Sequence, residues 1–411
     1  MKIFFSQHYS RNKGNISLLY TMVEVTKKQF PDAEIVVSSF DPEDTFITFG
    51  YKSCEWPFPT RKIVDAKRLN KAIAVFIEIF YLSISTLIAV LIRYKFINAK
   101  NLKGRFTPLK EIYESNIVVS PGGHLFTNYN KIAGVFAHFF PCFLSKIMKK
   151  PYAVMAQTIG PFFGLWELPA KTLTKFVLKN ADLVTIRDSN SFEQISKLKI
   201  EIKDIRKTNE LVFLYPDNES FSASKVKNKL GFTFHHIYYK RWMTKGEYID
   251  KMVKFINKIN AHYNFEISFI SMEKTIESKS DIPLLKEIRS KLDKQSNIEI
   301  ITISQSPNEL LSVFESLDFL VATKTHSVVY GLRKCIPTLA IAYEKKTDDF
   351  MRDFNQEYFS IPLSEFDAED AYVRFGKMVS REIEIKNMIK KNLVSVQQKA
   401  LENINLLINY N

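Results

Sequence analysis

The sequence predicts an α/β fold made of two doubly wound, Rossmann-like domains in tandem, facing a cleft and followed by a C-terminal helical tail. Short apolar runs, long enough for buried parallel strands, alternate with helical patterns along most of the 411 residues. Glycine, basic or small polar residues follow several of these runs directly, at the edge where open α/β sheets bind ligands. We place the first domain at residues 1–215, the second at 216–365 and the tail at 366–411.

The first domain opens as a strand, a loop, a helix and a strand, which indicates a parallel sheet. We expect strands at residues 2–5 and 33–40 and a helix at 16–30. The loop before that helix carries Gly14 and Asn15 among basic residues. Because it follows the carboxyl end of a strand, it either faces a ligand or is a solvated basic loop, and the residues alone leave both interpretations open.

Residues 72–92 form a stretch of 21 residues with a single charge, Glu78. Its length suits a transmembrane helix, but Glu78, three hydroxyl side chains and basic residues on both flanks argue against one. A helix that lies in the lipid headgroup layer tolerates basic residues at both ends. We expect a helix that is buried or faces a partner subunit, with docking in the headgroup layer and membrane spanning as the alternatives.

Three further strands of the first domain end in glycine, amide or guanidinium groups. These groups are Gly122 and Gly123 after the strand at 116–120, Gln157 and Gly160 after 152–156, and Arg187 after 183–186. Glycine lets the backbone approach a ligand closely, and arginine offers a fixed fork of donors to a carboxylate or phosphate. Tight turns for the glycines, and a salt bridge between Arg187 and Asp188, are the alternatives.

The second domain follows a last strand at 209–214 and a polar linker at 215–224. It repeats the alternation of strands and helices. We expect strands at 230–235, 266–271, 298–303, 319–322 and 338–342, and helices at 245–262, 282–292, 306–316 and 327–334. Residues 367–411 are mostly helical and amphipathic.

The strand at 319–322 leads directly into Lys324, Thr325 and His326. Thr323 or Thr325 is the expected N-cap of the following helix. Free backbone N–H groups and the helix dipole favour an anion at such a helix start. A polar surface loop is the alternative, and local sequence does not decide between them.

Composition favours an anionic partner. The net charge is +14 and the sequence pI is about 9.3, so phosphorylated metabolites, nucleic acid or a membrane surface are the candidate partners. No predicted helix or sheet combines clustered basic and aromatic residues, so we do not expect nucleic acid to bind. Three scattered cysteines show neither metal-ligand spacing nor a disulfide framework. We expect no metal, no cofactor and a cytoplasmic location.

Several motifs together resemble the polysaccharide pyruvyl transferase family, over most of the chain from Gly14 to Lys346. They are Pro121-Gly-Gly-His-Leu-Phe126, Gln157-Thr-Ile-Gly-Pro-Phe162, Ile186-Arg-Asp-Ser-Asn-Ser191, Thr323-Lys-Thr-His-Ser327 and Tyr343-Glu-Lys-Lys346. The resemblance implies a GT-B-like fold, with an acceptor side in the first domain and a donor side in the second. It implies transfer of the pyruvyl group of phosphoenolpyruvate to a sugar, as a ketal. The sugar would belong to a surface polysaccharide or its lipid-linked precursor.

The resemblance also implies roles for individual residues. His326 matches the catalytic histidine, and we expect it to act as the general acid, because imidazole exchanges protons near neutral pH. Arg187, Lys324 and Thr325 would bind the donor, with the two cations clamping its carboxylate and phosphate across the cleft. The remaining expected substrate contacts are Gly14, Asn15, Gly122, Gly123, Gln157, Gly160, Glu344 and Lys346.

Lys324 departs from the family pattern, which has arginine there; lysine keeps the charge but not the bidentate fork. Two alternatives therefore stay open. One is a GT-B glycosyltransferase that binds a nucleotide-sugar in the same cationic cleft, with Glu344 on the ribose. The other is a non-catalytic relative that binds a glycan or a membrane. In the docking alternative, the apolar helix would bring the protein to the inner face of a membrane that carries a lipid-linked saccharide. The sequence gives no oligomeric state.

Overall fold

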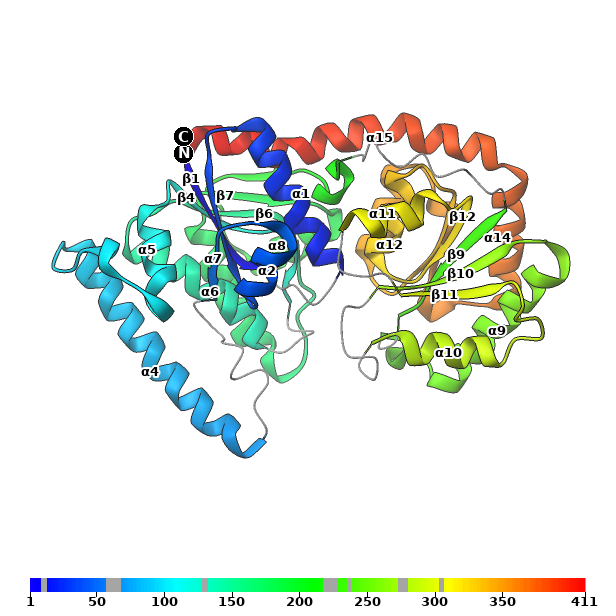
Figure 1. Cartoon of the computed structure of the whole chain (residues 1–411), viewed down its shortest axis with the longest axis horizontal. Helices are drawn as coiled ribbons and strands as arrows, with labels where there is room; N and C mark the ends of the chain where they lie inside the picture. The colour runs from blue at the N-terminus through cyan, green and yellow to red at the C-terminus, as the bar shows by residue number, and fades with distance from the viewer. Residues whose placement is uncertain are drawn as a thin grey trace. The chain divides into compact units, whose positions relative to one another are not determined.

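The computed structural model describes residues 1–8, 13–56, 68–127, 132–216, 228–235, 238–272, 280–302 and 307–410. The chain divides into two compact units. The first comprises Met1–Ser10, Leu18–Leu214 and Lys399–Asn411, and the second comprises Arg11–Ser17 and Tyr215–Gln398. Each unit is built around one parallel sheet with helices packed on it (Figure 1). Two doubly wound α/β units and a helical C-terminal tail confirm the predicted class of fold.

The sheet of the first unit has eight strands in the order β3-β2-β1-β4-β6-β7-β8, with β5 paired to β6. Its strands are β1 (Lys2–His8), β2 (Glu34–Ser39), β3 (Ser53–Glu55), β4 (Ile117–Ser120), β5 (Gly123–Phe126), β6 (Tyr152–Ile159), β7 (Leu183–Ile186) and β8 (Ile205–Lys207). The strand order changes direction between β1 and β4. Such a switch point is where doubly wound sheets bind ligands, at the carboxyl edge of the strands.

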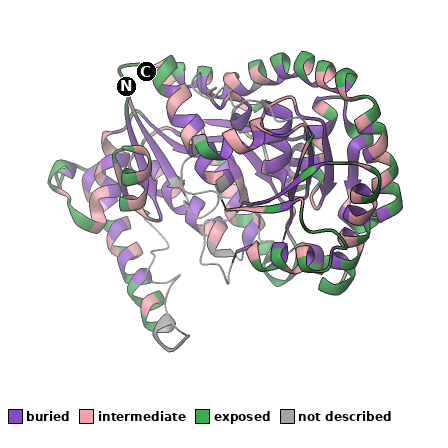
Figure 2. Cartoon of the chain, turned by 45° about the vertical axis from the view of Figure 1, so that its right-hand side comes forward, coloured by how far each residue is buried: buried purple, intermediate pink, exposed green. Residues whose placement is uncertain are grey.

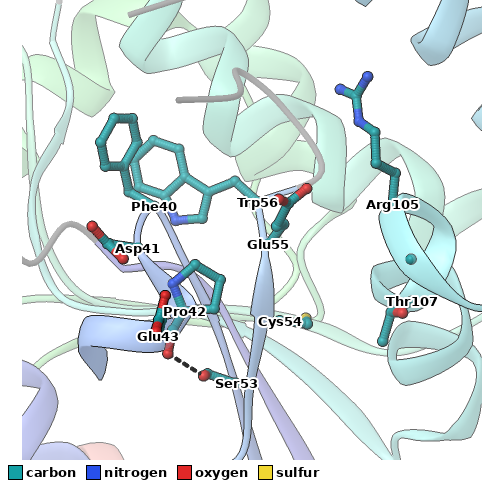
Figure 3. Close-up of a pocket in the computed structure, with 11 residues that line it drawn as sticks. Phe40, Asp41, Pro42, Glu43, Ser53, Cys54, Glu55, Trp56, Arg105 and Thr107 are labelled. Carbon is teal, nitrogen blue, oxygen red and sulfur yellow. Dashed lines mark hydrogen bonds between the residues drawn. The ribbon is translucent and has the colours of Figure 1, made fainter. Parts of the chain in front are cut away.

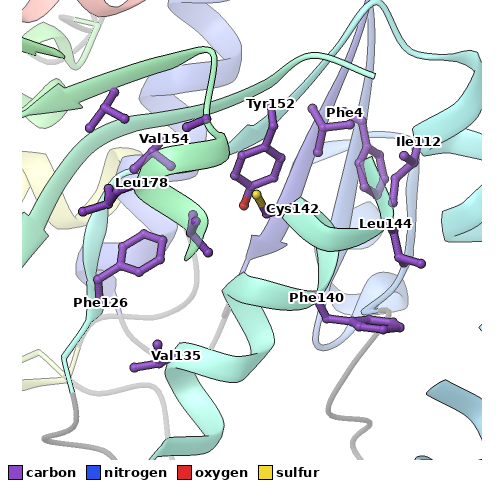
Figure 4. Packing of buried hydrophobic residues seen from close by; sticks show 14 of the residues in the cluster. Phe4, Ile112, Phe126, Val135, Phe140, Cys142, Leu144, Tyr152, Val154 and Leu178 are labelled. Atoms are coloured by element: carbon purple, nitrogen blue, oxygen red, sulfur yellow. The ribbon is translucent and has the colours of Figure 1, made fainter. Parts of the chain in front are cut away.

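Helices cover this sheet on both sides because its central strands are mostly apolar. The helices are α1 (Lys13–Gln29), α2 (Pro42–Phe49), α4 (Arg68–Arg93), α5 (Thr107–Glu114), α6 (Ile132–Ile147), α7 (Glu167–Asn180) and α8 (Ser189–Leu198). Every residue of β4, β6 and β7 is buried, as in strands covered on both faces. In the core, Phe4 and Tyr152 of the sheet pack with Cys142 and Leu144 of α6 (Figure 4).

The sheet of the second unit has six parallel strands in the order β11-β10-β9-β12-β13-β14. They are β9 (Lys229–Thr233), β10 (Glu266–Ser271), β11 (Ile298–Thr302), β12 (Phe319–Ala322), β13 (Thr338–Ala342) and β14 (Ser360–Pro362). The helices are α9 (Lys245–His262), α10 (Ile282–Ser290), α11 (Pro307–Glu315), α12 (Thr325–Arg333) and α13 (Lys345–Asp353). The strand order changes direction between β9 and β12, so the end of β12 lies at the switch point of this sheet.

Two helices, α14 (Ala368–Ser380) and α15 (Glu382–Asn405), form the tail. The end of α15 is bonded into the first unit by Asn403, which is fully buried. Its side-chain oxygen accepts hydrogen bonds from the hydroxyls of Thr185 (2.5 Å) and Thr208 (2.8 Å). Its side-chain nitrogen donates to the carbonyl of Asn209 at 3.2 Å. These bonds fix the last turn of the chain at the β7–β8 side of the sheet.

Two local predictions are wrong. Residues 209–214 do not form a strand, because Leu211–Leu214 is a 3-10 helix in which the Glu210 carboxylate accepts from the N–H of Val212. Neither Thr323 nor Thr325 caps α12, which begins at Thr325 without a side-chain cap. The Thr323 hydroxyl donates instead to the carbonyl of Thr233. Most of the predicted linker at 215–224 lies outside the described residues.

Helix α4 is buried along one face only. Figure 2 shows exposed and half-buried residues along the rest of its described length. Within the part of the chain that the structure describes, Ile73–Arg93 is the one helix long and apolar enough to cross a membrane.

Candidate active site

His326 lies in the first turn of α12, directly beyond the buried strand β12. The strand is central because its four residues, Phe319–Ala322, are apolar and pair with both β9 and β13. The imidazole is half-buried. A histidine at this place stands beside the first N–H groups of a helix, which have no carbonyl partner inside that helix. The position can therefore serve an anionic ligand and a proton donor together.

The first turn of α1 packs against this histidine within the second unit. A Cβ atom on Gly14 would lie 2.4 Å from Cγ and Nδ1 of His326, so only glycine leaves room for the ring. One turn further on, the Tyr330 hydroxyl donates to Ser17 at 2.7 Å. The structure thus brings Gly14 to His326, although 312 residues separate them in the sequence. Asn15 follows Gly14 in the same turn and is half-buried.

Lys324 is held by a buried carboxylate. Its ammonium donates to Asp281 at 2.9 Å, and both side chains are largely excluded from solvent. Asp281 also accepts from the Ser271 hydroxyl and from the N–H of Met272. Burial alone would raise the pKa of Asp281, but the charge of Lys324 and these hydrogen bonds outweigh burial and lower it. Lys324 is therefore fixed beside β12 as half of an ion pair.

The other predicted residues of the second unit are also engaged. The hydroxyl of Thr325 shares a hydrogen bond with that of Thr347 at 2.8 Å. Glu344 and Lys346 form an ion pair at 2.6 Å, with little exposure of either side chain. Both lie beyond β13, the neighbour of β12. The structure thus places Lys324, Thr325, His326, Glu344 and Lys346 at one edge of the sheet.

Arg187 is buried in the first unit, with 2% of its surface exposed. Its Nε donates to Thr158 at 2.9 Å and its Nη1 is paired with Glu210. The predicted alternative was a salt bridge to Asp188, but the Asp188 side chain has other hydrogen-bond partners. The Asp188 carboxylate caps α8 by accepting from the N–H of Ser191, and it also accepts from Thr158. Arg187 is thus rigidly placed at the carboxyl end of β7.

The glycine-rich motifs of the first unit join three strands to one another. Gln157 lies inside β6, which extends three residues beyond the predicted strand, and its side-chain nitrogen donates to the carbonyl of Pro121. Gly160 adopts φ +66° and accepts from His124. A side chain on Gly122 would press on Ala156, and Gly123 has φ +145°. These contacts hold the motifs in place beyond β4 and at the end of β6, and a role in binding substrate stays a prediction.

Sequence reasoning missed the two acids, Asp281 and Glu210. Each pairs with a predicted cation that lies far away in the chain: Asp281 is 43 residues from Lys324 and Glu210 is 23 residues from Arg187. Glu210 falls inside the predicted strand at 209–214, and Asp281 lies ten residues after the predicted strand at 266–271. No local signal therefore marked either acid as the partner of a cation at a strand end.

A cavity of about 620 Å³ lies in the first unit beyond β2 and β3. The residues that line it are Phe40, Asp41, Pro42, Glu43, Ser53, Cys54, Glu55, Trp56, Gly104, Arg105 and Thr107. The rings of Phe40 and Trp56 meet edge to face at 5.2 Å between centroids. Figure 3 shows Arg105 and Thr107 on the opposite side from Asp41 and Glu43. This volume is typical of small-ligand sites, and the sequence analysis did not anticipate it.

The chemistry of this cavity differs from that of the chain as a whole. Three carboxylates and one guanidinium line it, so its formal charge is negative within a strongly basic protein. Among the described residues, no three histidine, cysteine or acidic side chains gather closely enough to hold a metal ion. Burial, with nearby carboxylates, raises the pKa of the Cys54 thiol, so this cysteine stays protonated at neutral pH. The lining therefore suits a neutral ligand rich in hydroxyl groups.

The fold belongs to the GT-B-like class, as solved structures of similar architecture show. The alignment with S. aureus MnaA, solved as a co-structure with UDP, covers 100% of this chain and 96% of the MnaA chain. The two sequences are 13% identical and the TM-score is 0.63. Anabaena Alr3699/HepE in complex with UDP covers 100% and 98% at 10% identity and 0.61. UDP-GlcNAc 2-epimerase from Methanocaldococcus jannaschii covers 100% of both chains at 14% identity and 0.60. At these identities the likeness shows the fold alone.

The family is shown by sequence. The family model described as polysaccharide pyruvyl transferase matches residues 12–345, most of the chain and both units. The chain belongs to the polysaccharide pyruvyl transferase family, which makes it a transferase of polysaccharide biosynthesis with a saccharide acceptor. No curated protein matches it significantly. The matched span runs from the loop before Gly14 to Lys345 and includes His326 and Arg187.

Proposed function

We propose that this protein moves the pyruvyl group of phosphoenolpyruvate onto a sugar, forming a ketal, with His326 as the general acid. The observation that carries the proposal is the placement of His326. It is half-buried at the end of the central strand of its sheet and is packed against Gly14, inside the matched span of the family. A side chain held on two sides has a fixed orientation toward a bound donor, as general acid catalysis requires.

The reaction needs one proton from the enzyme. The imidazolium of His326 protonates the methylene carbon of phosphoenolpyruvate, which makes the neighbouring carbon electrophilic. One sugar hydroxyl adds to that carbon. A second hydroxyl then displaces phosphate, so two C–O bonds form, one C–O bond to phosphate breaks, and both hydroxyl protons are released. The neutral imidazole left by the first step can accept one of these protons.

Donor binding falls to Arg187, Lys324 and Thr325. Each of the two cations carries a buried acid of its own unit, Glu210 for Arg187 and Asp281 for Lys324. These acids hold the two cations in fixed positions before a ligand arrives, and in our proposal the cations then contact the carboxylate and the phosphate of the donor. Thr325 adds a hydroxyl and the backbone N–H of the first residue of α12.

The defining experiment follows phosphate release from phosphoenolpyruvate in the presence of saccharide acceptors, with the ketal detected by mass spectrometry. Release that depends on the acceptor, together with an added pyruvyl mass, is the expected result. Binding of phosphoenolpyruvate is measured in parallel by thermal shift. If phosphoenolpyruvate neither raises the melting temperature nor is consumed with any acceptor, the proposal fails.

A second candidate is a glycosyltransferase that uses a nucleotide-sugar. The observation that favours it is the shared fold, since S. aureus MnaA and Anabaena Alr3699/HepE were both solved with UDP. The thermal-shift screen separates the two functions when UDP and GDP are included. Stabilisation by UDP or GDP alone would favour the second candidate. A non-catalytic glycan-binding role predicts stabilisation by a saccharide without turnover of either donor.

The acceptor sugar, in our proposal, binds in the cavity beyond β2 and β3. Sugar rings present C–H faces that pack on aromatic side chains, and Trp56 supplies such a surface beside Phe40. Sugar hydroxyls donate to carboxylates, and Asp41, Glu43 and Glu55 supply these. The negative lining disfavours phosphoenolpyruvate there, which keeps donor and acceptor chemistry apart.

Replacing Trp56 by alanine is expected to weaken acceptor binding without affecting the donor. The apparent KM for the acceptor should rise about fivefold, because an aromatic contact contributes on the order of 1 kcal/mol beyond simple burial. The thermal shift caused by phosphoenolpyruvate should not change. Trp242→Ala, a half-exposed tryptophan of the second unit, is the control. Equal KM values for wild type and Trp56→Ala would place the acceptor elsewhere.

We propose further that the acceptor is lipid-linked and that the protein works at the cytoplasmic face of a membrane. The exposed apolar surface of α4 supports this location. Arg105 connects the two features, since it lines the cavity and also pairs with Glu78 of α4 at 2.5 Å. A saccharide in the cavity would thus be bound beside the helix that is suited to lipid.

A further inference from the structure

The polar and apolar faces of helix α4 are arranged in the opposite way to those of an ordinary surface helix. Its buried side carries Glu78, Tyr81, Ser85, Ala89 and Ile92, spaced three or four residues apart. The opposite side carries apolar residues: Ile73, Phe76, Phe80 and Leu87 expose 63%, 72%, 63% and 57% of their surfaces. A surface helix of a globular protein normally turns its charged face to water and its apolar face to the core. Between Ile73 and Ile92 the single charged residue, Glu78, faces inward and large apolar side chains face outward.

The two hydroxyl groups on the accessible side of α4, those of Ser83 and Thr86, are bonded within the helix itself. The hydroxyls of Ser83 and Thr86 donate to carbonyls one turn earlier in the same helix, at 3.0 and 2.8 Å. The Glu78 carboxylate is paired with Arg105. A helix surface whose polar groups are already bonded loses little on transfer from water to an apolar medium. The outward face of α4 therefore fits an environment that provides no hydrogen bonds.

The inward face of α4 ties the helix to the first unit. Arg105 lies over the ring of Tyr81 at 3.9 Å, and the Tyr81 hydroxyl donates to the Arg105 carbonyl. Ala89 and Ile92 belong to the hydrophobic core of that unit. To span a bilayer, α4 would have to break the Glu78–Arg105 pair and leave this core. These contacts favour a helix that lies along a surface.

The segment that follows α4 is strongly basic. From Ile79 to Lys110 the sequence contains no acidic residue. Its basic side chains include Arg93, Lys95, Lys100 and Lys103, all exposed. Exposed Tyr94 and Phe96 stand among them, with 61% and 78% of their surfaces accessible. Aromatic rings beside basic groups are typical of side chains at the headgroup level of a membrane.

We propose that α4 and the following segment dock the protein on an anionic bilayer, with the apolar face of α4 inserted in the plane of the headgroup layer. Charge selects this occupant. A second copy of the chain would bring the same basic segment into contact with itself, whereas anionic headgroups neutralise it. The inference rests on α4 and its flank alone, so it holds or fails independently of the reaction that the protein catalyses.

Co-sedimentation of the full-length protein with vesicles tests the proposal. Strong binding is expected to vesicles that contain phosphatidylglycerol, and weak binding to pure phosphatidylcholine. The combined change Lys95→Glu, Lys100→Glu and Lys103→Glu should weaken binding by about a hundredfold or more, because each lost lysine charge costs about fivefold and each glutamate adds repulsion from the anionic lipid. The change Phe76→Ser with Phe80→Ser should also abolish stable binding. Both sets of residues are exposed, so the fold should tolerate the substitutions.

Two matched control variants carry the same types of substitution outside α4 and the segment that follows it. Lys179→Glu, Lys197→Glu and Lys203→Glu alter the net charge equally on an exposed part of the same unit. Ile383→Ser with Val394→Ser removes exposed apolar side chains from α15. Both controls should bind vesicles like wild type. The proposal is overturned if wild type ignores phosphatidylglycerol vesicles, if the controls lose as much binding as the α4 variants, or if light scattering shows a dimer that Phe76→Ser with Phe80→Ser dissociates while vesicle binding is absent.

Discussion

Replacement of His326 by asparagine is expected to lower the rate of phosphate release from phosphoenolpyruvate by about 10² to 10⁴, the usual contribution of a positioned general acid. Asparagine keeps a polar side chain of similar reach but has no proton to give at neutral pH. Because the imidazole is half-buried at a helix start and not in the core, the melting temperature should stay close to that of wild type. Initial rates at saturating donor, with thermal melting as a check on folding, measure both effects.

Two companion variants make this result specific. His262→Asn removes an exposed histidine of the same unit, at the end of α9, and should leave the rate unchanged. Gly14→Ala keeps His326 but forces its ring to move, because the new Cβ would lie 2.4 Å from ring atoms. Alanine suits a helix better than glycine, so α1 itself should not be weakened. If the Gly14→Ala variant and the His326→Asn variant were both fully active, His326 would not be the general acid.

Replacement of Arg187 by methionine is expected to destabilise the protein by about 3 to 5 kcal/mol, because it leaves the Glu210 carboxylate buried and unpaired. Both side chains are almost wholly excluded from water. The same change also removes the donor to Thr158. Chemical denaturation followed by tryptophan fluorescence and by circular dichroism would measure the loss.

The double change Arg187→Met with Glu210→Met separates the ion pair from other effects. Two apolar side chains of similar size should restore most of the stability lost in the single variant, since no charge remains unpaired. Arg206→Met, in an exposed pair with Asp204 on the neighbouring strand, is the matched control and should be indistinguishable from wild type. A single variant as stable as wild type would contradict the buried ion pair.

The repetitive part of the fold was readable from sequence because each signal is local. The predictions for α9 at 245–262 and for β10, β12 and β13 coincide with the observed elements. The short strands at the edges of the two sheets gave no recognisable pattern in the sequence. β3 has three residues and β14 has three, too few for any periodicity to appear. The run at 211–214 is apolar and buried, but an apolar run of this length does not distinguish a strand from a helical turn.

The site was only partly readable. The sequence places His326 and Lys324 at a strand end, and the structure puts them there. The two ion pairs could not be predicted from sequence, because the tertiary structure decides which side chains come within bonding distance of each other. Arg187 pairs with Glu210 although Asp188 is adjacent, since the Asp188 carboxylate is already bonded to the first turn of α8. The contact of Gly14 with His326 and the cavity beside Trp56 likewise join segments whose proximity no local pattern records.

The hydrogen bonds of Asn403 can form only late in the synthesis of the chain. Nearly all of the first unit precedes the second unit in the chain, yet Thr185, Thr208 and Asn209 can bond Asn403 only after α15 has been made. The first unit therefore completes this hydrogen-bond network only after the ribosome has synthesised the second unit.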